Sequence, residues 1–209
     1  MPKKPRNVEE IHAVKEKIIT EALDLISQKG MEEFSMRKLA TRLGIAAKTI
    51  YNYYQNKDEI YLEILIKGFE SLNGKIAAAR LSEKQPKKKL EAMLRAYIDF
   101  GTENVDFYAL MFTLHVPKFS DYVGTPMESI AKRELDTALQ VTYSFAEVVQ
   151  EIYQDRQDIA EERMQNKLVH LWCHVHGFVA GYNNSILTYM HKNPLVLREE
   201  IVKLVLDNL

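Results

Sequence analysis

The stretch from Ser35 to Tyr61, SMRKLATRLGIAAKTIYNYYQNKDEIY, decides the fold that we predict for this chain. Apolar residues at helical spacing predict a short first helix, and these are Leu39, Ala40 and Leu43. Gly44 would end this helix, because glycine takes a positive φ at no steric cost and so permits a tight turn. A second short helix, at about residues 47–53, would bury Ile50 and expose polar and aromatic groups without a carboxylate. The pattern predicts a helix-turn-helix whose second helix fits a DNA major groove.

The same stretch resembles the DNA-binding signature of the TetR (tetracycline-repressor-like) family of transcriptional regulators. The matching features are the Thr49-Ile50-Tyr51 step, the aromatic Tyr54 and the Lys57-Asp58-Glu59 opening of a fourth helix, for which Asn56 is the expected N-cap. The resemblance covers about residues 11–65. One residue departs from the family pattern: Ala46 stands where a hydroxyl usually caps the recognition helix, so we expect that cap to be absent.

We expect ten residues to contact DNA or to support the contact: Ser35, Arg37, Ala47, Lys48, Thr49, Tyr51, Asn52, Tyr53, Tyr54 and Lys57. Lys48 and Asn52 are the predicted base readers. Phosphate contact or support is predicted for Tyr51, Tyr54 and Lys57. The resemblance implies phosphate contacts for Ser35 and Arg37, although Ser35 would also serve as a helix cap alone.

A local basic face accompanies these residues, made of Arg37, Lys38, Arg42, Lys48 and Lys57. DNA binding would depend on this local face, because the formal net charge of the whole chain is only −1. The N-terminal residues 1–8 carry three further cations and are interpreted either as a disordered tail or as an arm on DNA.

The rest of the chain is predicted to be helical as well, giving an all-α protein of about nine helices. Only eight glycines and six prolines occur among 209 residues, and apolar stripes of helical period dominate. Outside the helix-turn-helix, the stripes predict helices at about residues 8–29, 56–79, 87–104, 105–114, 126–153, 159–191 and 194–207. We expect a helix-turn-helix DNA-binding domain at residues 1–55 and an effector-binding and dimerisation domain at residues 56–209.

Composition restricts where the protein acts. No run of 18 or more apolar residues occurs, and residues 1–10 lack an apolar signal core, so we expect neither a membrane association nor export. The single cysteine excludes an intrachain disulfide and agrees with a cytoplasmic location. No phosphate-binding glycine loop and no nucleophile–base pair are evident, so we predict no cofactor and no enzymatic activity.

A second resemblance concerns the larger domain. Tyr108-x-Leu-Met-Phe112 with Pro117, and later Trp172-x3-His176-Gly177, is similar to the WHG type of TetR-family C-terminal domain. Such a domain implies a small-molecule effector site, for which aromatic residues with polar groups and methionine are suited. The expected effector-binding residues are Tyr97, Phe107, Met111, Phe112, His115, Tyr143, Trp172 and His176; an ordinary core is the alternative for each.

Two other interpretations concern the segment around Trp172. His170 and His174 are four residues apart and share a helix face, but two histidines do not complete a metal site, so we predict no metal. A metal-responsive regulator remains an alternative, with His115 as a possible third ligand. We expect Cys173 to be a small buried residue rather than a catalytic thiol.

The same segment predicts how two subunits associate. Gly177, Ala180 and Gly181 give a helix face with almost no side chains, which lets another helix approach closely. With Ile201, Leu204 and Val205 of the last helix, this face would form a four-helix interface in a homodimer. Close packing within one subunit is the alternative.

Together these patterns predict a transcriptional regulator, most simply a repressor that binds a near-palindromic double-stranded operator as a homodimer and is released by a small-molecule effector. The alternative is a helical adaptor that binds protein partners and does not bind DNA.

Overall fold

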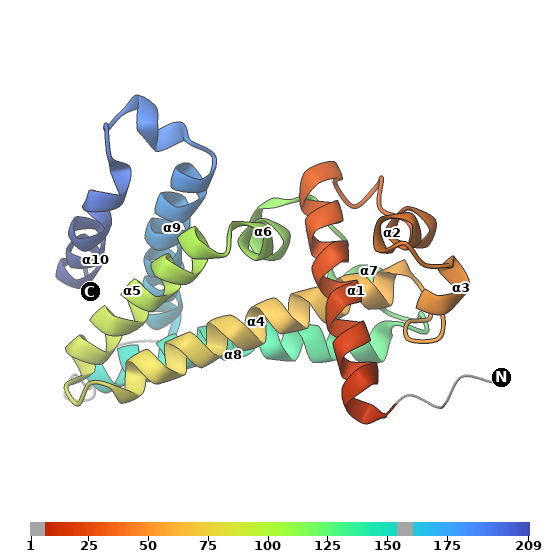
Figure 1. The fold of residues 1–209 in the computed structure, drawn as a ribbon. Coiled ribbons are helices and arrows are strands. Elements are labelled where there is room, and N and C mark those ends of the chain that lie inside the picture. The colour runs from red at the N-terminus through yellow and green to blue at the C-terminus, as the bar shows by residue number, and fades with distance from the viewer. Residues whose placement is uncertain (1–6, 154–160) are drawn as a thin grey trace. The chain divides into compact units, whose positions relative to one another are not determined.

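A computed structural model describes residues 7–153 and 161–209, and the described residues are helical without any strand (Figure 1). The α-helices are α1 (Val8–Lys29), α2 (Met36–Leu43), α3 (Ala47–Ile50), α4 (Lys57–Leu81), α5 (Pro86–Glu103), α6 (Val105–Tyr108), α7 (Phe119–Tyr122), α8 (Glu128–Tyr153), α9 (Glu161–Asn183) and α10 (Arg198–Asp207). A π-helical turn (Ala109–Thr113) and two 3₁₀ turns (Ile186–Tyr189 and Pro194–Leu197) complete the helical elements. The predicted all-α architecture is confirmed.

The chain divides into two compact units. Unit 1 holds the described residues up to Lys67 together with Ala109–Leu135. Unit 2 holds Gly68–Tyr108 and the described part of Asp136–Leu209. The long helices α4 and α8 therefore contribute residues to both units.

Unit 1 begins with a three-helix core that follows the predicted pattern. Asn7 caps α1 in a reciprocal box with Glu10, at 2.7 and 3.0 Å, and the helix ends at Gly30 as expected. Gly44 has φ 65°, the left-handed conformation that closes the turn between α2 and α3. The side chains that this arrangement buries almost completely are Ile18, Ala22, Ile26, Phe34, Leu39 and Ile50.

The second part of unit 1 packs against the start of α4. Tyr61 is fully buried and donates a hydrogen bond to the carbonyl oxygen of Pro117 at 3.1 Å. Tyr122 makes a longer contact with the Asp58 carboxylate at 3.5 Å. Burial of Glu134, near the start of α8, raises the pKa of its carboxyl to about 7, and the nearby Lys118 only partly opposes this. A partly buried carboxyl without full compensation thus lies in the unit that carries the helix-turn-helix.

Unit 2 is organised around α5, which packs against α9 and α10. At Gly101 the contact is so close that an added Cβ would lie 2.5 Å from Val179 Cγ1 and 2.9 Å from the Tyr108 ring. Asn183 donates to the Gly101 carbonyl oxygen at 2.9 Å and so joins the end of α9 to α5. An ion pair between Arg198 and Asp99, at 2.5 Å, joins α10 to the same helix. Glycine at position 101 therefore sets the α5–α9 distance.

Gly101→Ala is expected to destabilise the protein by about 1–3 kcal/mol, because the stiff valine and the buried tyrosine ring leave no room for a methyl group. Gly74→Ala is the matched control: it lies within α4, its Cβ would meet nothing within 4 Å, and alanine favours the helix by about 0.5–1 kcal/mol. Urea unfolding of both variants checks the prediction, which is contradicted if the two midpoints shift in the same direction.

Several helix boundaries differ from the predicted ones. The helix predicted to reach His191 ends at Asn183, because Ser185 adopts a left-handed conformation (φ 59°) and the chain continues as a 3₁₀ turn. Short polar side chains compete there for backbone groups: the Thr188 hydroxyl donates to the Ser185 carbonyl oxygen at 2.6 Å. The final helix likewise opens with a 3₁₀ turn, and α7 occupies a segment predicted as loop. The break expected between the helices at about residues 126–153 and 159–191 lies outside the described residues.

Candidate nucleic-acid interface and effector site

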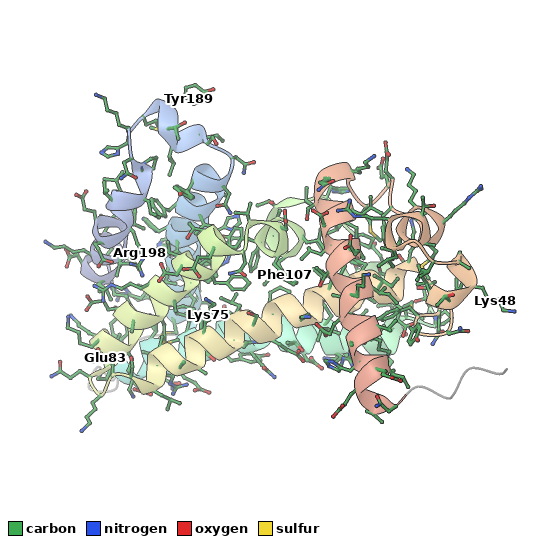
Figure 2. All side chains as sticks on the ribbon, in the orientation of Figure 1. Lys48, Lys75, Glu83, Phe107, Tyr189 and Arg198 are labelled. Carbon is green, nitrogen blue, oxygen red and sulfur yellow. The ribbon has the colours of Figure 1, made fainter. Side chains whose placement is uncertain are left out.

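The segment from α3 to the start of α4 presents the predicted base readers to solvent. Ile50 is completely buried, whereas Lys48 and Asn52 are exposed and Tyr51 is 53% exposed. Figure 2 shows the Lys48 side chain pointing away from the helix ribbon. One buried anchor therefore holds a short helix whose opposite side is free to meet a partner.

Other predicted DNA residues are more enclosed. Tyr54 is only 4% exposed, Lys15 Nζ lies 5.3 Å from its ring centre, and burial raises the pKa of its phenol. Tyr54 thus supports the recognition segment from its buried side. Ala47, Thr49 and Tyr53 are half-buried.

The caps of this region follow the sequence. The Ser35 hydroxyl accepts a hydrogen bond from the Lys38 amide at 3.2 Å and so caps α2. Ala46 precedes α3 without any side-chain cap, as predicted. Asn56 accepts from the Glu59 amide at 2.9 Å and caps α4. Of the three helices α2, α3 and α4, only the recognition helix α3 therefore begins without a side-chain cap.

The predicted basic face is smaller than expected. Arg42 is bound by two carboxylates of α1, Glu21 (2.7 Å) and Asp24, and Lys38 pairs with Glu33 at 3.1 Å. The prediction that Arg42 belongs to an available basic face is therefore wrong: α1 packs against α2 and brings its acids to the guanidinium. Within the described residues, the members of the predicted face without an ion pair are Arg37, Lys48 and Lys57.

Lys57→Ala is expected to weaken binding to all DNA sequences alike and to reduce the slope of log K against log salt by about 1 per subunit, as for one lost phosphate contact. Lys38→Ala is the control, because its ammonium already pairs with Glu33 and should release no counterion. Anisotropy titrations at several salt concentrations measure both slopes. Equal slopes for Lys57→Ala and wild type would show that Lys57 does not touch phosphate.

The predicted effector residues are spread over both units. Met111, Phe112 and His115 belong to unit 1, where Met111 is buried and His115 is exposed. The others belong to unit 2; of these, Tyr143 on α8 is 58% exposed and Phe107 on α6 is half-buried (Figure 2).

Within unit 2 the structure brings four polar aromatic side chains together. Tyr97 on α5 and Tyr108 on α6 are each 1% exposed, and their hydroxyl oxygens are 3.2 Å apart. The Tyr108 hydroxyl lies 2.7 Å from His176 Nδ1. Trp172 stacks on His176 with ring centres 4.4 Å apart. We call these four residues the aromatic cluster.

Tyr108 is the member that we did not predict as an effector residue. The sequence signal was present, since Tyr108 begins the patch that resembles the WHG domain, but nothing in the spacing placed it against α9. Burial raises the pKa of both phenols, that of Tyr97 to about 12, although polar interaction with Tyr108 and Trp172 opposes the shift at Tyr97. Burial lowers the pKa of His176. At neutral pH the cluster is therefore uncharged.

The predicted dimer face is partly open and partly covered by its own chain. A Cβ at Gly177 would meet nothing within 4 Å, whereas one at Gly181 would lie 3.0 Å from Leu187. Leu204 is 46% exposed and Ala180 and Ile201 are half-buried, but Val205 is only 4% exposed and lies in the core of unit 2.

Cys173 is exposed on α9, so the prediction of a buried cysteine is wrong. It falls on the same side of the helix as Gly177, four residues later, rather than on the side that packs against α5. His170 and His174 are exposed too, and His174 Nδ1 donates to the His170 carbonyl oxygen at 2.6 Å. Among the described residues, no three histidine, cysteine or acidic side chains gather as a metal site would require.

The described helices include none with the length and apolarity needed to cross a membrane.

Two family models match the chain. Residues 18–64 match bacterial regulatory proteins of the tetR family, and residues 90–187 match the tetracyclin repressor-like C-terminal domain. The nucleoid occlusion factor SlmA of Haemophilus influenzae is 27% identical over 106 residues, which is 47% of this chain and 48% of SlmA. The chain therefore spans about half the length of the curated relatives it matches.

Solved structures share the fold at low identity. A regulatory protein of the tetR family from Rhodococcus RHA1 has a TM-score of 0.71 at 16% identity, covering 92% of this chain and 95% of its own. The regulator FadR from Bacillus subtilis, in complex with stearoyl-CoA, has a TM-score of 0.70 at 12% identity, covering 93% and 98%.

Proposed function

Because the chain belongs to the TetR family of DNA-binding transcriptional regulators, we propose that it is a repressor that binds a near-palindromic operator as a homodimer and leaves it when a small-molecule effector binds. Residues 1–55 would form the DNA-binding domain and residues 56–209 the effector-binding and dimerisation domain. We place its action in the cytoplasm.

The observation that carries this proposal is the exposed side of α3. Lys48 and Asn52 would read base edges in the major groove, with Arg37 and Lys57 on phosphates. Dimer symmetry would place the second copy of α3 in a successive major groove, one helical turn of DNA away.

The proposed dimer interface uses the open part of the α9–α10 face, around Gly177 and Leu204. The exposed Cys173, one helical turn before Gly177, extends this surface of α9. Apolar side chains exposed on one face of a subunit are typical of surfaces that another chain covers.

The proposed effector is a mostly apolar molecule of drug-like size that contacts the aromatic cluster, and the stearoyl-CoA bound by the similar FadR structure supports an acyl compound as the first class to test. The effector would bind more tightly to a dimer state whose recognition helices are wrongly spaced for the operator. The helix α4 would transmit this change. A difference of about 3 kcal/mol would reduce operator binding on the order of 100-fold.

The test selects operators from random DNA and then measures affinity at several salt concentrations, with native mass spectrometry for subunit count and retained ligand. A dimer with a palindromic preference and salt-dependent affinity supports the proposal. Absence of salt-dependent DNA binding would instead support the adaptor function.

Asn52→Ala sharpens the same test, because it should relax base preference at one position by roughly 1–3 kcal/mol while overall folding is kept. An unchanged selected sequence would contradict the assignment of Asn52 as a base reader. Glu70→Ala, at an exposed position of α4, is a control that should leave the selected sequence unaltered.

A further inference from the structure

Three members of the aromatic cluster form a continuous line of hydrogen bonds inside unit 2. The line runs from Tyr97 to Tyr108 and ends at His176 Nδ1. Three helices contribute to it, and both phenols are removed from water. Such a buried polar line holds each side chain in one orientation, since losing a partner would leave a buried polar group unsatisfied.

The chemistry of the groups gives the line a direction. A phenol is a far stronger acid than a neutral imidazole N–H, and an imidazole nitrogen is the better acceptor. The 2.7 Å distance is typical of an O–H donor, so Tyr108 donates to His176 Nδ1. Neutral His176 then carries its proton on Nε2.

We propose that Tyr108 is a positioning residue that holds His176 as the Nε2–H tautomer, and that the effector site thereby selects apolar ligands whose polar end accepts a hydrogen bond. This inference rests on the proposed effector role of His176. Carboxylates, esters and thioesters accept a hydrogen bond from an N–H, whereas a protonated amine has no acceptor and meets a like dipole. The stacked Trp172 is 41% exposed, so ligand has access to this edge of the cluster.

The tautomer is tested without ligand or DNA. Nitrogen-15 NMR of histidine-labelled protein, with the His176 signal assigned by its loss in His176→Gln, should show the Nε2–H form. Tyr108→Phe should change this signal towards the other tautomer or a mixture. Tyr97→Phe is the matched control: its ring is equally buried and loses one hydroxyl, but the Tyr108–His176 bond stays. An Nδ1–H signal in the wild type, or equal changes in both variants, would overturn the proposal.

Ligand selection is tested with four probes of equal chain length: dodecanoate, methyl dodecanoate, dodecanoyl-CoA and dodecylamine. Trp172 is the only tryptophan, so its fluorescence reports binding directly. The acceptor probes should bind about 10-fold or more tightly than the amine, and their rank identifies free acid or thioester as the natural form. Tyr108→Phe should remove this preference and Tyr97→Phe should keep it.

Equal affinity for the amine, or no response to any probe, would overturn the ligand class. Operator binding is measured in the same samples. If the protein still binds operator but ignores all four probes, the inference fails while the proposed DNA-binding function stands. If operator binding is absent and the acceptor probes still bind more tightly than the amine, the proposed function fails instead.

Discussion

Gly177→Leu is expected to convert the proposed dimer to a monomer and to lower operator affinity by about 10²–10⁴-fold, the gain usually provided by joining two binding modules. The structure makes this variant informative, because a Cβ added at Gly177 meets nothing within 4 Å in its own subunit. The leucine should therefore leave the subunit folded and act only where a second subunit approaches. Light scattering at micromolar concentration and anisotropy with operator DNA measure the two effects.

Two comparisons show whether the effect is specific. Gly177→Ala adds only a methyl group and should weaken association far less than leucine. Gly181→Leu is a poor test, because its side chain would collide with Leu187 of the same subunit and destabilise it directly. A Gly177→Leu protein that remains a dimer with wild-type affinity would move the interface away from this part of α9.

Glu134→Gln is expected to make the protein less sensitive to pH. The groups that interact electrostatically with Glu134 are Tyr61 of α4, Tyr122 of α7 and Lys118 before it. Burial raises the pKa of this carboxyl from 4.5 to about 7. A raised pKa means that its protonated form is favoured on folding, so this contribution is fully present below pH 4.5 and is lost as the pH rises through 7.

The size of the effect follows from the shift. Each pKa unit corresponds to about 1.4 kcal/mol, and screening at this half-buried group reduces the total to about 2 kcal/mol. The variant and the wild type should be equally stable near pH 4.5, and the variant more stable by that amount at pH 8. Urea unfolding between these pH values measures the difference. Glu70→Gln, at an exposed position of α4, is the control. If the stability difference between Glu134→Gln and the wild type does not change with pH, the prediction is contradicted.

Local signals in the sequence were sufficient for the helix-turn-helix. The bounds of α1, the left-handed Gly44, the absent cap at Ala46 and the Asn56 cap all follow from residue type and spacing. Each is decided within one or two helical turns of chain, where propensity and capping act. The assignments of residues to DNA and effector remain predictions.

The features that were missed depend on tertiary packing. Arg42 is neutralised by acids 18 and 21 positions earlier, and only the angle between α1 and α2 brings them together. Tyr108 meets His176 across 68 residues of chain. Cys173 was expected inside because its type favours burial, yet the packing of α9 on α5 turns it outward. Periodicity identifies a buried face, but it does not say which polar residues of two helices will meet.

The pairing of Arg42 with Glu21 and Asp24 has a consequence for how the regulator would find its site. A cation already held by carboxylates releases no counterion when DNA approaches, so it adds nothing to the attraction that every DNA sequence exerts. If the few unpaired cations of the predicted basic face, among the described residues, are the ones that meet DNA, residence on non-cognate DNA would be brief. The search would then proceed by repeated dissociation and re-encounter rather than by long sliding, and the discrimination between sites would depend on the groups that touch bases.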